Sequence, residues 1–271
     1  MKKIQIIILA FMLGIVPIQA VYSYDDFDTD MMILDGARDN LLNELNALNK
    51  KLKEYGSDSH QFILAVERGE LEKVKSLTEK GIDVNATKNN LTPLMRTAFK
   101  GHLDIVKYLI SKGANVNAKS DKYGFTALMM TAGKGYLEVV KYLISKGADI
   151  NDKDKNGTTA LMYASKNGHL EVVKYLINKG ADMNAKDNYG GTALIMASSQ
   201  GYLEVVKSLI KGKSGLLSIF SKGADVNVVV STKIKGVMYN LTALDVAKNN
   251  EIAEVLRKAG AKSVTEIKNK E

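Results

Sequence analysis

The chain has 271 residues, of which 45% are hydrophobic and 25% charged, and its formal net charge is +8. This composition is typical of a folded globular protein and excludes intrinsic disorder as the main state. The sequence has no cysteine, which excludes disulfide frameworks, thiolate metal sites and cysteine nucleophiles.

The first twenty residues have the three-part pattern of a secretory signal peptide. Lys2 and Lys3 give a basic start, residues 4–16 are nearly all apolar, and Ala20 is a small residue before a polar stretch. An uncleaved membrane anchor is the alternative, but the apolar run is shorter than the roughly 20 residues that cross a bilayer. We therefore expect cleavage after Ala20, an exported chain that is periplasmic or secreted, and no stable membrane insertion of the mature protein.

An acidic arm over residues 21–58 comes before a basic body. Residues 24–59 hold nine acidic and four basic residues, a net charge of −5. The formal +8 becomes +6 without Lys2 and Lys3, so the rest of the chain carries +11. The two segments therefore differ in charge and are expected to differ in role.

Within the arm, apolar residues recur every three or four positions from Met31 to Tyr55, and Arg38 interrupts the stripe. This spacing predicts one amphipathic helix over residues 29–55. We expect this helix to dock on the start of the body as an N-terminal cap. Dimerisation through a short coiled coil is the alternative.

The body repeats one pattern. The phrase Thr-Pro-Leu or Thr-Ala-Leu returns at spacings of 34, 33, 33 and 50 residues, beginning at Thr92, Thr126, Thr159, Thr192 and Thr242. A glycine stands nine residues after each of the first four threonines, and these copies close on Gly-Ala. A fixed period of this kind indicates stacked structural units.

Each copy predicts two helices. Thr126 is expected to cap the first helix, which ends at Gly135, and apolar residues at three- and four-residue spacing, such as Leu137 and Val140, form the second. Gly147 is expected to end the second helix in the left-handed conformation. Two helices and a turn cannot bury their apolar faces alone, so the copies must stack.

This pattern resembles the ankyrin repeat over roughly residues 59–262. The family's Thr-Pro-Leu-His-x-Ala, Gly-His-Leu-Glu-Val-Val and Gly-Ala-Asp-Val-Asn all stand here with minor changes. The resemblance implies an all-α ankyrin repeat solenoid of about six helix-turn-helix units, with the added N-terminal amphipathic helix. The first unit, from His60 to Asn85, is degenerate. The last, from Thr242 to Ala261, has Arg257 where earlier units have Ile, as a capping repeat should.

The sequence departs from the family pattern in several places. Met95, Met129 and Met162 stand where the family has His, so apolar packing must hold these positions. Residues 211–220 are an insertion, and residues 228–241 form an unusually long finger, as the loops between units are called. Residues 263–271 are expected to form a polar C-terminal tail.

Other polar residues have structural interpretations. His102 and His169 hold the family's helix-start position, and His60 is interpreted as the N-cap residue of the first unit. Asn90 and Asn240 stand where other units have turn glycines, and Asn tolerates a left-handed turn.

We expect no enzyme activity. No nucleophile–base pair, carboxylate dyad or metal cluster appears in the sequence outside positions that the repeat explains, so we predict no catalytic residue, metal or cofactor. Lysines of the second helices, such as Lys141 and Lys174, follow an acidic residue by three positions. These lysines are accounted for as part of a solvent-exposed helix face, where each pairs with an acidic residue. We therefore expect no nucleic acid as a partner.

The resemblance implies that a partner protein binds the concave side, through the fingers and the ends of the first, inner helices. Carried over by position, the finger residues are Lys88, Asn89, Leu91, Lys122, Tyr123, Phe125, Lys155, Asn156, Thr158, Asn188, Tyr189, Met238, Tyr239 and Leu241. The inner-helix ends add Phe99, Lys100, Lys134, Lys166, Asn167, Ser199 and Gln200.

Three tyrosines of this set, Tyr123, Tyr189 and Tyr239, share one finger position, and Lys122 and Lys155 lie beside it. An aromatic and basic stripe suits a partner protein with an acidic surface. We therefore expect a monomeric protein–protein interaction module that acts outside the cytoplasm. A host-directed secreted effector and a structural helper of the cell envelope are the alternatives.

We predict that the exported protein begins at Val21, because the signal pattern ends at Ala20. N-terminal sequencing of the exported material measures this directly. Exported material that still begins at Met1 would contradict the prediction.

Overall fold

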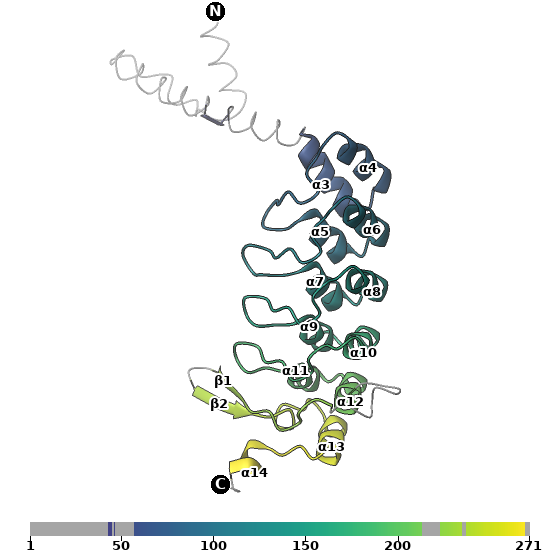
Figure 1. The fold of residues 1–271 in the computed structure, drawn as a ribbon. Coiled ribbons are helices and arrows are strands. Elements are labelled where there is room, and N and C mark those ends of the chain that lie inside the picture. Colours follow the sequence, from purple (N-terminus) through teal and green to yellow (C-terminus); the bar gives the residue numbers. More distant parts are fainter. Residues whose placement is uncertain (1–42, 45, 47–56, 213–222, 235–236, 269–271) are drawn as a thin grey trace, which may run out of the picture. The chain divides into compact units, whose positions relative to one another are not determined.

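The computed structural model describes residues 43–44, 46, 57–212, 223–234 and 237–268 (Figure 1). Of residues 231–234 and 237–239 it describes the backbone alone. The chain divides into two units, Met1–Ser57 and Asp58–Glu271. The predicted signal segment, most of the insertion and nearly all of the arm lie outside the described residues. Asn43, Glu44 and Asn46, which belong to the predicted arm helix, are helical.

Within the second unit, the described residues form five consecutive helix pairs, here called repeats 1 to 5. They are α3 (Asp58–Arg68) with α4 (Leu71–Glu79), α5 (Pro93–Lys100) with α6 (Leu103–Ser111), α7 (Ala127–Lys134) with α8 (Leu137–Ser145), α9 (Ala160–Lys166) with α10 (Leu170–Asn178), and α11 (Ala193–Gln200) with α12 (Leu203–Lys211).

The repeats stack in series. The first helices form one column and the second helices a parallel one, while the fingers project to one side (Figure 1). Successive first helices pack on one another from α3 to α11, and the second helices do the same from α4 to α12. This confirms the predicted solenoid of helix-turn-helix units.

The helices begin and end where the sequence predicts. The Thr126 hydroxyl accepts the backbone N–H of Met129 at 3.3 Å, and Thr92, Thr159 and Thr192 cap their helices in the same way. Gly135 ends α7 with φ 79°, and Gly147 follows α8 with φ 87°. These left-handed values are strained for residues with a Cβ, which is why glycine holds both positions.

The core runs through all five repeats without a break. Met95, Met129 and Met162 are at most 2% exposed, which confirms that apolar packing holds the positions where the family has His. Phe62 and Val74 of repeat 1 are also buried.

The middle glycine of each of repeats 1 to 4 makes room for a ring from the next repeat. A Cβ on Gly135 would lie 2.5 Å from the His169 ring, and one on Gly168 would lie 2.5 Å from the Tyr202 ring. The His169 ring is also held by a hydrogen bond, with Nε2 3.0 Å from the Gly133 carbonyl oxygen. His102 bonds repeat 1 likewise, so the structural interpretation of both histidines is confirmed.

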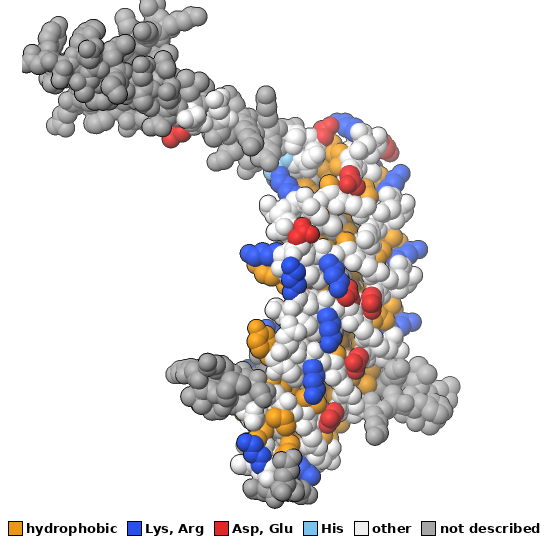
Figure 2. Space-filling view, turned by 60° about the vertical axis from the view of Figure 1, so that its left-hand side comes forward, with side chains coloured by type: hydrophobic (Ala, Val, Ile, Leu, Met, Phe, Trp, Pro, Cys, Tyr) orange, Lys and Arg blue, Asp and Glu red, His pale blue; other side chains and the backbone are white. Residues whose placement is uncertain are grey.

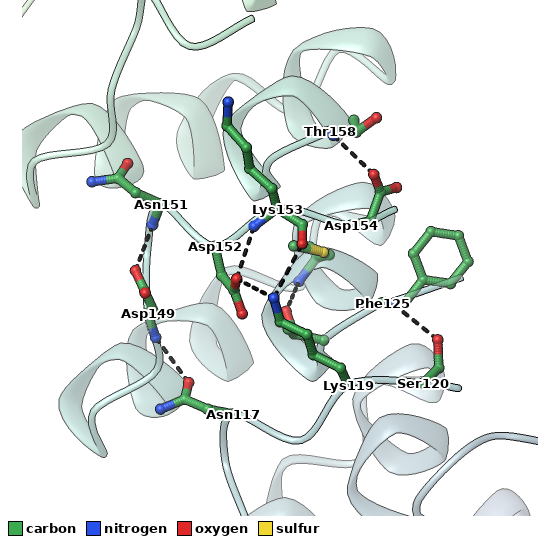
Figure 3. Close-up of polar contacts among 12 residues, drawn as sticks. Asn117, Lys119, Ser120, Phe125, Asp149, Asn151, Asp152, Lys153, Asp154 and Thr158 are labelled. Atoms are coloured by element: carbon green, nitrogen blue, oxygen red, sulfur yellow. Dashed lines mark hydrogen bonds and ion pairs between the residues drawn. The ribbon is translucent and has the colours of Figure 1, made fainter. Parts of the chain in front are cut away.

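Asparagine side chains join the bases of neighbouring fingers. The Asn117 Nδ2 donates to the Gly147 carbonyl at 2.9 Å, and its Oδ1 accepts the N–H of Asp149 at 2.9 Å (Figure 3). Asn85, Asn151 and Asn227 each make the same two bonds to the repeat that follows them. Each such side chain therefore fixes the step between two repeats.

The C-terminal part is less regular than the sequence predicts. The long finger contains β1 (Val230–Ile234) and β2 (Val237–Leu241), an antiparallel pair, in a fold expected to be all-α. Asn240 pairs with Ser231 inside this sheet, so its interpretation as a left-handed turn residue is wrong. The β-branched residues around Val230 favour strands over a short turn.

The sixth unit lacks the first helix of the predicted helix pair. Residues 243–246 form turns, and α13 (Asn250–Lys258) and α14 (Val264–Lys268) follow. The Asp245 carboxylate accepts the N–H groups of Thr242 and Val264, which ties the chain end to this turn where other repeats begin a helix. Arg257 is exposed on α13, as expected of a terminal repeat.

The start of repeat 1 differs from the prediction. His60 lies inside α3 instead of preceding it, so it is not the N-cap residue.

The end of repeat 5 closes across the insertion. The Ala224 N–H donates to the Leu209 carbonyl at 2.9 Å, which is the bond that Ala181 makes to Leu176 in the repeat before. The repeat geometry therefore resumes at Ala224.

We predict that Gly168→Ala lowers the free energy of unfolding by about 1–3 kcal/mol more than Gly147→Ala does. Both glycines have a positive φ, 76° and 87°, so the backbone strain is similar. At Gly168 the new methyl group also meets the Tyr202 ring, whereas nothing lies within 4 Å at Gly147. Urea denaturation measures the difference, and equal losses would contradict this role of the ring.

Candidate functional site

Fingers 2, 3 and 4, over residues 112–126, 146–159 and 179–192, share an internal brace. The Ser120 hydroxyl accepts the N–H of Phe125 at 2.9 Å, and the Asp154 carboxylate accepts that of Thr158 at 2.8 Å (Figure 3). Asp187 makes the same bond to Gly191 in finger 4. This hydrogen bond therefore fixes the turn within each finger.

Backbone hydrogen bonds join these three fingers at their tips. The Lys155 N–H donates to the Tyr123 carbonyl at 3.0 Å, and the Asn188 N–H donates to the Asn156 carbonyl at 2.8 Å. In finger 1, Lys88 and Leu91 pair with each other across a tight turn. Asn89 and Asn90 hold that turn with φ 52° and 63°, which confirms the left-handed interpretation of Asn90.

Most of the predicted site residues are exposed at the fingers and inner-helix ends. The exposed ones are Asn89, Phe99, Lys100, Lys122, Tyr123, Lys134, Lys155, Asn156, Lys166, Asn167, Asn188, Tyr189, Ser199 and Gln200. Lys88, Leu91, Phe125 and Leu241 are half-buried. The side chains of Met238 and Tyr239 lie outside the described part of the structure.

Thr158 is the predicted site residue that the structure places below the surface. It is 9% exposed, because its N–H is held by the buried Asp154 carboxylate. Thr158 therefore supports finger 3 and does not offer its side chain to a partner.

Aromatic rings on this side lie close to lysine side chains. The Lys122 Nζ is 4.9 Å from the Tyr123 ring centroid, and the Lys134 Nζ is 4.4 Å from that of Phe99. These are cation–π distances. Tyr123 and Phe99 are 47% and 43% exposed, and Tyr189, two fingers away from Tyr123, is 67% exposed.

The sequence interpretation missed one row of residues on the inner helices. Four residues after each capping threonine stand Arg96, Met130, Tyr163 and Met196, all half-buried. Variation between the repeats could have identified this row from the sequence. The core positions around it repeat almost unchanged, whereas this position differs from one repeat to the next. The row lies on the same inner helices that carry Phe99 and Lys134.

Tyr163 of this row is tied to finger 3. Its hydroxyl donates to Asp154 Oδ2 at 2.6 Å. The pKa of Tyr163 is raised above its usual value, first because burial disfavours the phenolate and then because the Asp154 carboxylate accepts its hydrogen bond and repels a second negative charge. Tyr163 therefore stays protonated and acts as a donor that positions the finger.

The lysines on the two sides of the solenoid differ in their partners. On the outer helices, Lys141, Lys174 and Lys207 each contact a glutamate three residues earlier, at 2.7–2.8 Å. The pKa of Lys207 is raised because it donates a hydrogen bond to Glu204. These pairs neutralise Lys141, Lys174 and Lys207 locally.

On the finger side, lysines gather in a row along the repeats, with a row of acidic residues beside it (Figure 2). The acids at the finger bases include Asp152, which pairs with Lys119 at 2.5 Å. Within the described residues, no ion pair joins a carboxylate to the lysines of the fingertips and inner-helix ends, which are Lys100, Lys122, Lys134, Lys155 and Lys166. This surface therefore carries unneutralised positive charge.

Two further features were searched for in the described part of the chain. No group of three or more His, Asp or Glu side chains there is arranged to hold a metal ion. No helix there is both long and apolar enough to cross a bilayer.

The fold and this surface place the chain in the class of helical repeat proteins, in which stacked helix pairs present a row of loops on one side. The family model for ankyrin repeats in three copies matches residues 62–154 and again residues 151–229, and the chain belongs to the ankyrin repeat family. Ankyrin repeats indicate a protein–protein interaction module.

Part of the chain is similar to alpha-latrocrustotoxin-Lt1a from Latrodectus tredecimguttatus. The two are 46% identical over 76 residues, which is 27% of this chain and 5% of that protein. The chain therefore spans a small part of this relative.

We predict that Tyr163→Phe lowers the free energy of unfolding by about 1–2 kcal/mol at neutral pH, because the buried Asp154 carboxylate loses a donor. Tyr142→Phe is the matched control, since its hydroxyl makes no hydrogen bond among the described residues. With its raised pKa, Tyr163 also makes the wild type lose stability as the pH rises above about 10, and Tyr163→Phe lacks that part of the loss. Urea denaturation of both variants across this pH range measures both effects, and equal behaviour of the two would contradict the prediction.

Proposed function

We propose that this chain is a protein-binding module that acts outside the cytoplasm and holds an acidic segment of its partner against the fingers and inner-helix ends of repeats 2 to 4. The observation that carries the proposal is the unequal pairing of the lysines. Lys141, Lys174 and Lys207 of the outer helices each contact a glutamate. The lysines of the fingertips and inner-helix ends, which are Lys100, Lys122, Lys134, Lys155 and Lys166, contact no carboxylate within the described residues.

Charge of this kind favours association with an acidic partner. Unpaired surface lysines steer an oppositely charged partner toward the correct face and raise the rate of encounter. The exposed rings of Phe99 and Tyr123 supply the apolar contact area that charge alone does not give. The lysines of this surface therefore attract the partner, and the aromatic rings stabilise the complex.

The hydrogen-bonded fingers support the same proposal. Fingers 2, 3 and 4 are joined at their tips through Lys155 and Asn188, and each has an internal brace. A surface that is ordered before binding loses less conformational entropy when the partner arrives. Binding, and not catalysis, is the function that such a preformed surface suits.

Action outside the cytoplasm is part of the proposal because of the signal pattern in residues 1–20. A host-directed secreted effector and a structural helper of the cell envelope are two forms that this function can take. The compartment in which the partner is recovered distinguishes them, because an effector binds a host protein and an envelope helper binds an envelope protein.

We predict that reversing the charge of three surface lysines, in the variant Lys100→Glu, Lys122→Glu, Lys134→Glu, weakens partner binding by about tenfold or more. The matched control reverses three outer-face lysines, Lys141, Lys174 and Lys207, and changes the net charge by the same amount. The control should retain binding because only the location of the charge differs.

Pull-down from the exported fraction with the wild-type chain, followed by mass spectrometry, identifies the partner. Isothermal titration with that partner then gives the dissociation constants of both variants. Circular dichroism melts check that both variants are folded. An equal loss of binding in the two variants would contradict the proposed surface.

A further inference from the structure

Three aromatic side chains form a continuous patch where finger 2 meets repeat 4. The rings of Tyr123 and Phe125 are stacked, with centroids 5.3 Å apart. The Tyr163 ring, from α9, meets Phe125 edge to face at 5.9 Å. The patch therefore runs from an exposed fingertip down to the surface of an inner helix.

The surroundings of this patch are basic. The Lys122 ammonium lies over the Tyr123 ring, and the Lys155 Nζ donates to the Asp121 backbone carbonyl at 2.6 Å, which holds it beside finger 2. The Asp154 carboxylate nearby is buried and already accepts the Tyr163 hydroxyl and two backbone N–H groups. Asp121 is the acidic residue of finger 2, against three lysines in the same finger.

We propose that Tyr123, Phe125 and Tyr163 form an anchor subsite for one aromatic side chain of the partner, flanked in the partner by carboxylates that meet Lys122 and Lys155. This inference rests on the proposed function and names the local chemistry of the bound segment. Aromatic anchors seated among charged neighbours contribute a large share of the affinity of interfaces.

The geometry favours an aromatic anchor over an aliphatic one. The patch already contains one stacked and one edge-to-face ring contact, and a further aromatic ring gains from contacts of these kinds beyond the area that it buries. Carboxylates on both sides of the anchor then reach lysines that have no carboxylate partner among the described residues.

The subsite is held in place before binding. The Tyr163 hydroxyl is fixed by Asp154, and the Tyr123 carbonyl accepts the Lys155 N–H from the next finger. The Tyr123 ring is also stacked on Phe125, so both rings are partly ordered before the partner binds, which lowers the entropic cost of binding.

The chain contains no tryptophan, which gives a direct assay. A short peptide with one central Trp between two runs of Glu is titrated with the full chain, and the Trp emission is followed. Burial of the anchor should shift this emission to shorter wavelength. Two matched peptides replace the Trp by Ala or the Glu by Lys, and their binding is measured by titration calorimetry.

We expect the Trp→Ala peptide and the Tyr123→Ala chain each to raise the dissociation constant about tenfold. Tyr175→Ala is the matched control, because a lysine also lies over the Tyr175 ring but Tyr175 stands on the outer helix α10, and it should change binding less than about twofold. Phe125→Leu is a second variant that keeps apolar volume and removes the ring, and it should also weaken binding.

The outcomes separate the two proposals. Equal binding of the Trp and Ala peptides, or an equal loss in Tyr123→Ala and Tyr175→Ala, would overturn the anchor subsite while leaving an acidic partner in place. Binding of the Lys-flanked peptide as tightly as the Glu-flanked one would overturn the charge complementarity on which the proposed function depends.

Discussion

Each helix pair of this chain buries its apolar residues against the pair that follows, because two helices of eight and nine residues have no interior of their own. The contacts between repeats therefore carry the stability that a globular domain takes from one central core. Rings over glycines and asparagine bridges make these contacts directional. They set both the distance and the rotation from one repeat to the next.

The positions that stack the repeats are constrained, and a second set of positions is free to vary. Inward residues such as Leu128 and Leu161 are nearly identical between repeats, since each fills the same space. Fingertips and the outward positions of the inner helices face no neighbour of this kind and differ from repeat to repeat. The proposed binding surface therefore consists of residues that the stacking does not use.

The sequence was sufficient to predict the helix pairs, their threonine caps and their terminal glycines, because these depend on local rules that act within one repeat. It was not sufficient for Asn240, which stands where other repeats have a turn glycine but pairs with Ser231 in a sheet. The same holds for Thr158, which a finger position marks as exposed and the Asp154 carboxylate draws inward. For Asn240 the deciding contact comes from a strand pair outside the repeated pattern, whereas for Thr158 it is the brace that fingers 2, 3 and 4 share.

The inner-helix row that includes Arg96 and Tyr163 was missed for a related reason. A half-buried position looks like core in a periodicity analysis, because periodicity marks which face a residue occupies but not how far it is covered. The aromatic and basic character of the fingers was visible in the sequence. The joining of Tyr123, Phe125 and Tyr163 into one patch required the structure, since these residues come from two repeats.

The bond from the Ala224 N–H to the Leu209 carbonyl has a consequence for how this protein can change. It restores the repeat geometry on the far side of an added segment, so the number of residues between these two positions is uncoupled from the stacking. Lengthening a loop whose ends are already held together costs little, since closure entropy grows only with the logarithm of its length. This junction is therefore a place where the chain can acquire new sequence, or an inserted domain, without altering the register of the repeats on either side.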